Sequence, residues 1–379
     1  MRKKAFNIPV LFVLMSGLLL SCTSGNINTS NSSNTQATYA YFIAFSRDES
    51  DNYFNRTLTY TSSGDGKLVP TNNAIINNDI NAAAIVTNPK LPYAYIVNSD
   101  GGSEGGSIAM YNISSSGDLI PLEPLLVRTG FKPYSLTISS NGNYGYVAND
   151  DSTISMYSIV NGALLPLTPE STISEDFDSS MVLLTPNDKY AYANNLLNNT
   201  ISMYNVLANG SLSLMSESNI STQAFPYYIA MHPSGKYLYS INRDGNSINM
   251  FSIDNNGILQ PLQPESYIAT NPLPKSMTIN PAGTIAYVLN ENNEILTYTI
   301  NSSGVLQLLP NTSIQTGEGT FGFTIDPKGE YGYVTGFGDI NMTIYSIANN
   351  GTLTQSSTES AGYFNGATPI SLTFYTNGN

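Results

Sequence analysis

A repeat of 46–54 residues runs through most of the chain and limits the fold more than any other feature. One copy reads YSLTISSNGNYGYVAND (134–150) followed by TISMYSIVNGALLPL (153–167). The aromatic residue of the second segment occurs seven times, at Tyr60, Tyr111, Tyr157, Tyr204, Phe251, Tyr298 and Tyr345. The last Tyr of a Tyr-x-Tyr pair marks the same position in all seven copies, at Tyr41, Tyr95, Tyr146, Tyr192, Tyr239, Tyr287 and Tyr333, with Ile285 replacing the first Tyr in the sixth copy. Seven copies that agree on two markers predict a chain built from seven similar units.

Each copy of the repeat contains four short apolar segments, which we letter a to d. In the copy above they are PYSLTI (133–138), YGYVAN (144–149), TISMYSI (153–159) and ALLPL (163–167). Alternating Tyr, Ile, Val and Leu predict half-buried β-strands, and the Asn-Gly pairs between the segments predict tight turns. One four-stranded sheet cannot bury both of its faces, whereas seven sheets in a ring can. We therefore predict an all-β fold, a seven-bladed β-propeller of four-stranded blades.

The two ends of the repeat region predict how the ring closes. The chain ends in a copy of strand a, Pro369–Phe374, while the first copy begins at Tyr39 with strand b. The first blade therefore takes strand a from the C-terminus and strands b, c and d from the N-terminus. This 1+3 closure removes the exposed edges that a linear solenoid would have to cap.

Residues 1–21 are typical of an export signal. Three basic residues (2–4) precede an apolar run (8–20) that is shorter than the roughly 20 residues of a membrane-spanning helix. The run ends in Leu-Leu-Ser-Cys (19–22), which resembles the bacterial lipobox, and Cys22 is the only cysteine. We predict an exported lipoprotein that a lipid on Cys22 anchors to a membrane. Thr23 replaces the Asp that retains some lipoproteins at the inner membrane, which favours the outer membrane, on its periplasmic or its surface face.

The segment 22–37 is rich in Ser, Asn and Thr and carries no charge, which predicts a flexible tether ahead of the propeller domain, residues 38–379. Without its signal the chain carries 11 basic and 27 acidic residues, a net charge of −16. This charge argues against nucleic acid as a partner, because phosphate binding needs clustered Lys and Arg. We expect a monomer whose partners are the lipid anchor and an envelope protein or a small-molecule ligand.

The acidic residues are concentrated on one predicted face. In a propeller the d–a and b–c loops share one face (the b–c face), and the a–b and c–d turns share the other (the a–b face). The a–b face receives six acidic and five basic residues, and the b–c face receives 21 acidic and six basic residues. This face either keeps the protein soluble or attracts a cationic partner or Ca²⁺. Its loops lack EF-hand spacing and the chain has one histidine, so we predict no metal site and no cofactor.

The four-residue ends of strand b resemble those of known bacterial propellers. YIVN (95–98), YVAN (146–149), YVLN (287–290) and YVTG (333–336) resemble the YVTN-repeat propellers of bacterial envelopes. The complete unit, with its NPxG or DPxG turn and its SIxxYxI…GxLxPL segment, resembles the lactonase family of seven-bladed propellers, which includes a 6-phosphogluconolactonase. The resemblance covers residues 39–379 and implies the fold, with lactone hydrolysis as a candidate activity.

Arg243 is the residue to which the resemblance assigns a role. Asn242–Ile248 is similar to the family's Asn-Arg-Gly-x-x-Ser-Ile segment, which implies that Arg243 binds an anion or a carboxylate; the alternative is an ion pair with Asp244. Active family members have a histidine-containing segment where this chain has Phe131–Tyr134, without histidine. His232 falls in an a–b turn by repeat alignment, about one strand length from Arg243. We therefore predict that His232 is structural.

Two functions remain open from the sequence. The first is a non-enzymatic envelope propeller that binds or scaffolds a partner through its acidic b–c face. The candidate binding residues on that face are Arg128, Arg243, Glu175, Asp176 and Asp178. The second is a sugar-lactone hydrolase, in which basic residues bind an acidic lactone and a carboxylate of the same face activates water. Its candidate catalytic residues are Arg243, Lys132, Lys275, Asp150 and Asp151. The missing histidine and the acidic face favour the binding module.

Overall fold

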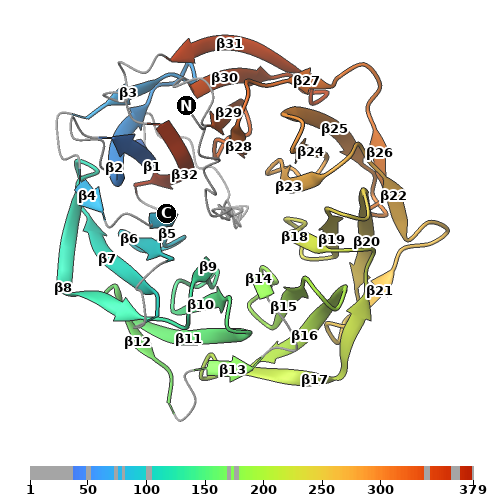
Figure 1. Cartoon of the computed structure of the whole chain (residues 1–379), viewed down its shortest axis with the longest axis horizontal. Coiled ribbons are helices and arrows are strands. Elements are labelled where there is room, and N and C mark those ends of the chain that lie inside the picture. Colours follow the sequence, from blue (N-terminus) through green and yellow to red (C-terminus); the bar gives the residue numbers. More distant parts are fainter. Residues whose placement is uncertain are drawn as a thin grey trace, which may run out of the picture.

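The computed structural model describes residues 37–47, 53–71, 76–78, 82–99, 105–168, 172–174, 179–336, 342–359 and 368–377. These residues form seven antiparallel sheets, each a blade, which radiate from a common hub (Figure 1). The predicted seven-bladed β-propeller is therefore confirmed. The predicted signal segment, Cys22 and nearly all of the tether lie outside the described residues.

In each blade the strands succeed one another from the hub outward. Blade 1 consists of β32 (Thr368–Thr376), β1 (Thr38–Arg47), β2 (Tyr53–Ser62), β3 (Leu68–Pro70) and β4 (Ile76–Asn78). Blade 2 consists of β5 (Ala82–Thr87), β6 (Tyr93–Asn98), β7 (Ser107–Ile113) and β8 (Leu119–Arg128). Blade 3 consists of β9 (Pro133–Ile138), β10 (Tyr144–Asn149), β11 (Thr153–Val160), β12 (Ala163–Pro166) and β13 (Thr172–Ser174). Blade 4 consists of β14 (Ser179–Leu184), β15 (Tyr190–Asn195), β16 (Thr200–Val206) and β17 (Leu212–Ser221).

The remaining three blades follow the same order. Blade 5 consists of β18 (Pro226–Met231), β19 (Tyr237–Asn242), β20 (Ser247–Ile253), β21 (Leu259–Pro261) and β22 (Tyr267–Ala269). Blade 6 consists of β23 (Pro274–Ile279), β24 (Ile285–Asn290), β25 (Glu294–Ile300), β26 (Leu306–Leu308) and β27 (Ile314–Gln315). Blade 7 consists of β28 (Thr320–Ile325), β29 (Tyr331–Gly336), β30 (Met342–Ile347) and β31 (Leu353–Glu359).

The ring closes in blade 1 as the sequence predicted. The C-terminal strand β32 is the innermost strand of that blade and pairs antiparallel with β1, with Phe42 opposite Leu372 and Tyr39 opposite Tyr375. Beyond the paired strands, the N–H of Asn377 donates to the carbonyl of Ala37 at 3.0 Å. The two ends of the propeller are thus held together by a backbone ladder.

The outer strand differs from the prediction in four blades. Blades 1, 3, 5 and 6 have a second outer segment, which pairs with the N-terminal half of strand c. In blade 3, for example, β12 pairs with the end of β11, while β13 places Ser174 opposite Thr153 at its start. The extra segments give the outward backbone groups of strand c partners along its whole length.

The Tyr-x-Tyr pairs join each blade to the next. The hydroxyl of the second Tyr is buried and donates to a glycine carbonyl in the c–d turn of the following blade, at 2.7–3.1 Å. The seven pairs are Tyr41–Gly117, Tyr95–Gly162, Tyr146–Gly210, Tyr192–Gly257, Tyr239–Gly304, Tyr287–Gly351 and Tyr333–Gly66. The last of them connects blade 7 to blade 1 and so completes the ring. Burial raises the pKa of Tyr239 above its ordinary value, which keeps this hydroxyl a donor.

The first Tyr of the pair explains why the c–d turns contain glycine. Gly210 has a φ of +85°, and a Cβ built on it would lie 2.2 Å from the ring of Tyr144 in the preceding blade. In five further c–d turns a glycine with positive φ meets a tyrosine ring in the same way, at Gly66, Gly117, Gly162, Gly257 and Gly304. The repeat therefore encodes contacts between neighbouring blades as well as the strands themselves.

The hydrophobic core is also shared between blades. Tyr95 and Ile108 of blade 2 lie in one buried cluster with Leu136 and Val147 of blade 3. A blade removed from the ring would expose both of its apolar faces, so its stability depends on its neighbours. The described part of the chain contains no helix with the length and hydropathy needed to cross a bilayer.

Candidate functional site

Several inner strands carry a β-bulge at their N-terminal ends, which lie on the b–c face. In β9 the pairing with β10 steps from Ser135 to Pro133, which leaves Tyr134 without a partner in the ladder. The same step occurs around Tyr227 in β18, Lys275 in β23 and Phe321 in β28. A bulge redirects the side chain of the extra residue. Because the inner strands surround the hub, these four side chains lie around its opening on the b–c face, which we name the mouth.

A second set of equivalent residues follows directly after strand b. The N–H of Arg243 donates to the carbonyl of Phe225, and the N–H of Glu291 donates to that of Leu273, both at 2.9 Å. Asp150 makes the corresponding bond to Lys132 at 3.2 Å. These backbone bonds hold each side chain beside the bulge of its own blade.

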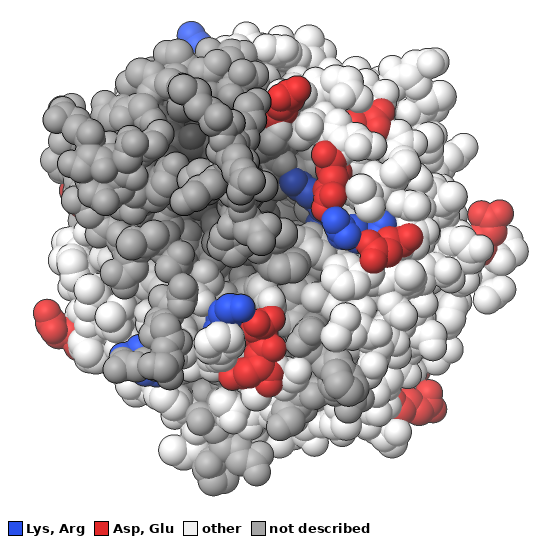
Figure 2. Space-filling view, in the orientation of Figure 1, with Lys and Arg blue, Asp and Glu red and all other residues white. Residues whose placement is uncertain are grey.

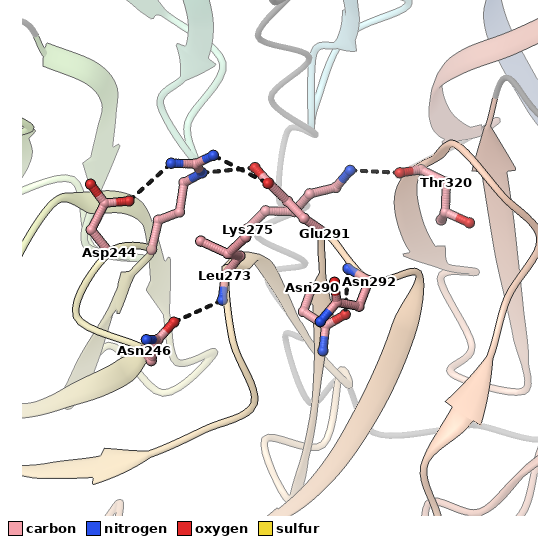
Figure 3. Close-up of polar contacts among 9 residues, drawn as sticks. Asp244, Asn246, Leu273, Lys275, Asn290, Glu291, Asn292 and Thr320 are labelled. Carbon is pink, nitrogen blue, oxygen red and sulfur yellow. Dashed lines mark hydrogen bonds and ion pairs between the residues drawn. The ribbon is translucent and has the colours of Figure 1, made fainter.

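Arg243, Asp244, Lys275 and Glu291 form the group that we name the hub cluster (Figure 3). Arg243 binds Glu291 with two parallel bonds, Nε to Oε1 at 2.7 Å and Nη2 to Oε2 at 3.1 Å. Its Nη1 binds Oδ1 of Asp244 at 2.9 Å. The guanidinium thus joins blade 5 to blade 6, and hydrogen bonding by Glu291 raises the pKa of Arg243.

Lys275 extends from its bulge toward the next blade (Figure 3). Its Nζ donates to the carbonyl of Thr320 at 2.5 Å and lies 5.6 Å from the centre of the Phe321 ring. Burial lowers the pKa of Lys275 to about 8, and the Glu291 carboxylate opposes part of that shift. This amine therefore titrates close to neutral pH.

Tyr227 borders the same cluster. Burial raises the pKa of its hydroxyl to about 12; the charge of Glu291 adds to the rise, and that of Arg243 opposes it. The hydroxyl remains protonated at neutral pH and can act as a hydrogen-bond donor. The Tyr227 ring also stacks on Phe225, with 6.2 Å between ring centres.

A second charged group, which we name the blade-3 cluster, contains Lys132, Tyr134, Asp150 and Asp151. Asp150 accepts the hydroxyl of Tyr134, and its Oδ2 lies 3.4 Å from Nζ of Lys132. Asp151 accepts the N–H of Phe131 at 2.8 Å and the hydroxyl of Thr153 at 2.6 Å. Both carboxylates therefore help to hold the d–a and b–c loops together.

The two charged groups lie on opposite sides of the mouth. Figure 2 shows blue and red side chains gathered over the ends of β9 and β10 and, across the hub, over β18, β23 and β24. Among the described residues, the two groups beside the mouth therefore carry both signs of charge.

Other predicted site residues lie elsewhere. Arg128 is exposed at the end of β8, the outermost strand of blade 2, and so lies on the b–c face but away from the mouth. Glu175, Asp176 and Asp178 lie outside the described residues. His232 makes bonds on the a–b face, with Nε2 2.8 Å from the carbonyl of Gly283 in the next blade and Nδ1 2.7 Å from Ser234 Oγ. These contacts agree with a structural role.

Sequence reasoning missed Glu291, although the repeat contained its signal. By alignment Glu291 occupies the same place as Asp150 and Arg243, the first position after strand b. Because equivalent positions of the blades surround the hub, charged residues at this position in three blades could have predicted a group of charged side chains around the mouth. Within the described ranges, no three Asp, Glu or His side chains gather closely enough to hold a metal ion.

Comparison with known proteins agrees with the fold and with the repeat. The family described as "Lactonase, 7-bladed beta-propeller" matches residues 91–272, which contain the blade-3 cluster and Arg243. Over this part, just under half of the chain, the sequence is similar to the lactonase family. No curated protein sequence matches the chain significantly.

Among solved structures, the chain is similar to several bacterial propellers. A putative 6-phosphogluconolactonase of Bacteroides fragilis is 19% identical with a TM-score of 0.71, and the match covers 91% of this chain and 100% of that one. The periplasmic gluconolactonase of Pseudomonas aeruginosa is 18% identical with a TM-score of 0.71, covering 88% and 99%. A putative 6-phosphogluconolactonase of Bacteroides uniformis is 18% identical with a TM-score of 0.72, covering 90% and 100%. At these identities the likeness establishes the fold.

Proposed function

We propose that this protein hydrolyses a sugar lactone at the mouth of its b–c face. The observation that carries the proposal is the hub cluster, in which a desolvated lysine amine lies near a carboxylate that an arginine holds in place. The family and the names of the structural neighbours support the same activity. The alternative of a purely binding module receives less support, because neither the family match nor the names of these structural neighbours point to it.

Lactone hydrolysis needs a base for the attacking water and a donor for the carbonyl oxygen. In our proposal Glu291 takes a proton from water as the water oxygen attacks the carbonyl carbon. The Lys275 ammonium group donates a hydrogen bond to the carbonyl oxygen as negative charge develops on it. The ring C–O bond then breaks, and Glu291 returns the proton to the departing ring oxygen, which yields the open hydroxy acid.

Arg243 has a positioning role in this scheme. Each oxygen of Glu291 accepts one bond from the guanidinium, so each keeps a second lone pair for a water molecule. The Glu291 side chain is 37% exposed, which leaves it accessible to solvent and substrate. Two parallel bonds fix the plane of the carboxylate, as a general base requires.

The pH dependence of turnover tests the role of Lys275. The protonated amine is the active form, and its pKa is about 8, so kcat should be highest below pH 8 and fall by about tenfold for each pH unit above it. Lys275→Arg should keep its charge and show no such fall. The measurement is lactone hydrolysis from pH 6 to 10 after subtraction of spontaneous hydrolysis. A wild-type rate that rises through pH 8 would instead make the neutral amine the base and would refute this role.

We also propose that the protein is an exported lipoprotein, anchored at the outer membrane through Cys22. Ala37, the first described residue, lies at the a–b end of blade 1, so a tether that leaves from there would direct the mouth away from the membrane. Cys22→Ser should move the protein from the membrane fraction to the soluble fraction on cell fractionation. A variant that stays in the membrane fraction would contradict anchoring through this cysteine.

A further inference from the structure

We propose that the mouth selects a sugar lactone without a phosphate or other anionic group. The inference rests on the proposed lactone hydrolysis and adds the charge of the substrate. It follows from how the charged and aromatic side chains around the mouth are partnered.

Arg243, the cation best suited to bind a phosphate, already has anionic partners. A guanidinium recognises phosphate through its fork of N–H donors. In Arg243 this fork is shared between the two oxygens of Glu291 and Oδ1 of Asp244, with all three bonds between 2.7 and 3.1 Å. A phosphate would have to displace a carboxylate, and the displaced carboxylate would remain near it as a like charge.

The other two cations of the two clusters are also engaged. Lys132 lies 3.4 Å from a carboxylate oxygen of Asp150 and 5.1 Å from the centre of the Phe131 ring. Lys275 donates to the Thr320 carbonyl and lies near the Phe321 ring, and the charge of Glu291 acts on it. Three cations therefore face four carboxylates: those of Asp150, Asp151, Asp244 and Glu291. Among the described residues at the mouth, this balance gives a phosphate, which carries about −1.5 to −2 charges at pH 7, no net attraction.

The bulge residues instead fit an uncharged sugar. Tyr134, Tyr227 and Phe321 are all partly exposed and occupy equivalent bulges around the mouth. Aromatic rings at such positions can pack against the apolar C–H face of a sugar ring, while the Tyr227 hydroxyl can hydrogen-bond to a sugar hydroxyl. Recognition of this kind does not require charge on the ligand.

The test compares D-glucono-1,5-lactone with its 6-phosphate on the same purified propeller, residues 38–379. We expect kcat/KM for the uncharged lactone to exceed that for the phosphorylated lactone by at least tenfold. The opposite preference would overturn the inference and leave the hydrolase proposal intact. If neither lactone is hydrolysed, the hydrolase proposal fails, and calorimetric binding of gluconate and 6-phosphogluconate decides the charge preference separately; tighter binding of the phosphorylated acid would overturn it.

Asp244→Asn tests the physical cause of the preference. The variant removes one carboxylate from the guanidinium of Arg243 and leaves Glu291 in place, so it should raise kcat/KM for the phosphorylated lactone about threefold to tenfold. The measured quantity is the ratio of kcat/KM for the phosphorylated lactone to kcat/KM for the uncharged lactone, which should rise. Glu330→Gln is the matched control, because it removes the same charge from an exposed a–b turn on the opposite face. An equal gain in both variants, or no gain in Asp244→Asn, would refute the charge argument.

Discussion

Replacing Glu291 with glutamine should lower kcat for lactone hydrolysis by about 10²–10³-fold, with a small effect on KM. The amide keeps one oxygen that can accept a bond from Arg243, but it cannot take a proton from water. General-base catalysis contributes about 10²–10⁴-fold, and the remaining rate reflects binding and the Lys275 donor. The measurement is steady-state hydrolysis at pH 7, corrected for the spontaneous reaction.

The control for this variant is Glu318→Gln. Glu318 is exposed in the loop that leads into blade 7 and has no place in the proposed mechanism, so its loss removes the same charge from the same face. Its kcat should stay within about twofold of wild type. Unaltered turnover in Glu291→Gln, with a thermal unfolding midpoint like that of wild type, would rule out this carboxylate as the base.

Gly210→Ala should lower the free energy of unfolding by about 3 kcal/mol or more. An alanine at a φ of +85° is strained by about 1–2 kcal/mol. Its Cβ would also lie 2.2 Å from the ring of Tyr144, so the ring or the turn must move, which adds about 1–3 kcal/mol. The movement would further disturb the bond from the Tyr146 hydroxyl to the Gly210 carbonyl, 2.7 Å long, which joins blades 3 and 4.

The free energies of unfolding are measured by urea denaturation for Gly210→Ala and for Gly64→Ala, which serves as the control. A Cβ on Gly64 would have no heavy atom within 4 Å, so this substitution should change the free energy of unfolding by less than about 0.5 kcal/mol. Equal stability of the two variants would contradict the role assigned to the contact between the c–d turns and the tyrosine rings.

The tyrosine and glycine contacts show why so much of the fold could be predicted. Tyr239 and Gly304, for example, lie 65 residues apart, but each is a fixed position of the repeat, so one motif encodes the same contact between every pair of adjacent blades. Ring closure was predictable for the same reason, since the C-terminal copy of strand a had a vacant place only in blade 1. The division of the outer strand into two segments was not predictable. It depends on how many residues after the c–d turn stay paired with strand c before the chain leaves the sheet.

The candidate site was predicted only in part. Arg243 and Lys275 came from the sequence, and the structure places both in the hub cluster beside the mouth. Glu291 was missed, and Asp150 and Asp151, the carboxylates proposed from the sequence to activate water, bind their own loops and neighbouring side chains. The sequence placed Arg128 on the b–c face but did not give its distance from the hub, because strand alternation does not reveal how far from the hub a residue lies.

The sequence alone determined the number of blades, the closure of the ring and the faces on which the loops lie. It could do so because these features repeat, and each copy of the motif carries the same backbone and packing requirements. Only the tertiary structure decided which charges meet. The bond between Arg243 and Glu291 joins loops of two different blades, and the bulge that directs Lys275 toward the mouth arises from strand pairing. Both depend on distances across the ring, which a linear pattern of residues does not contain.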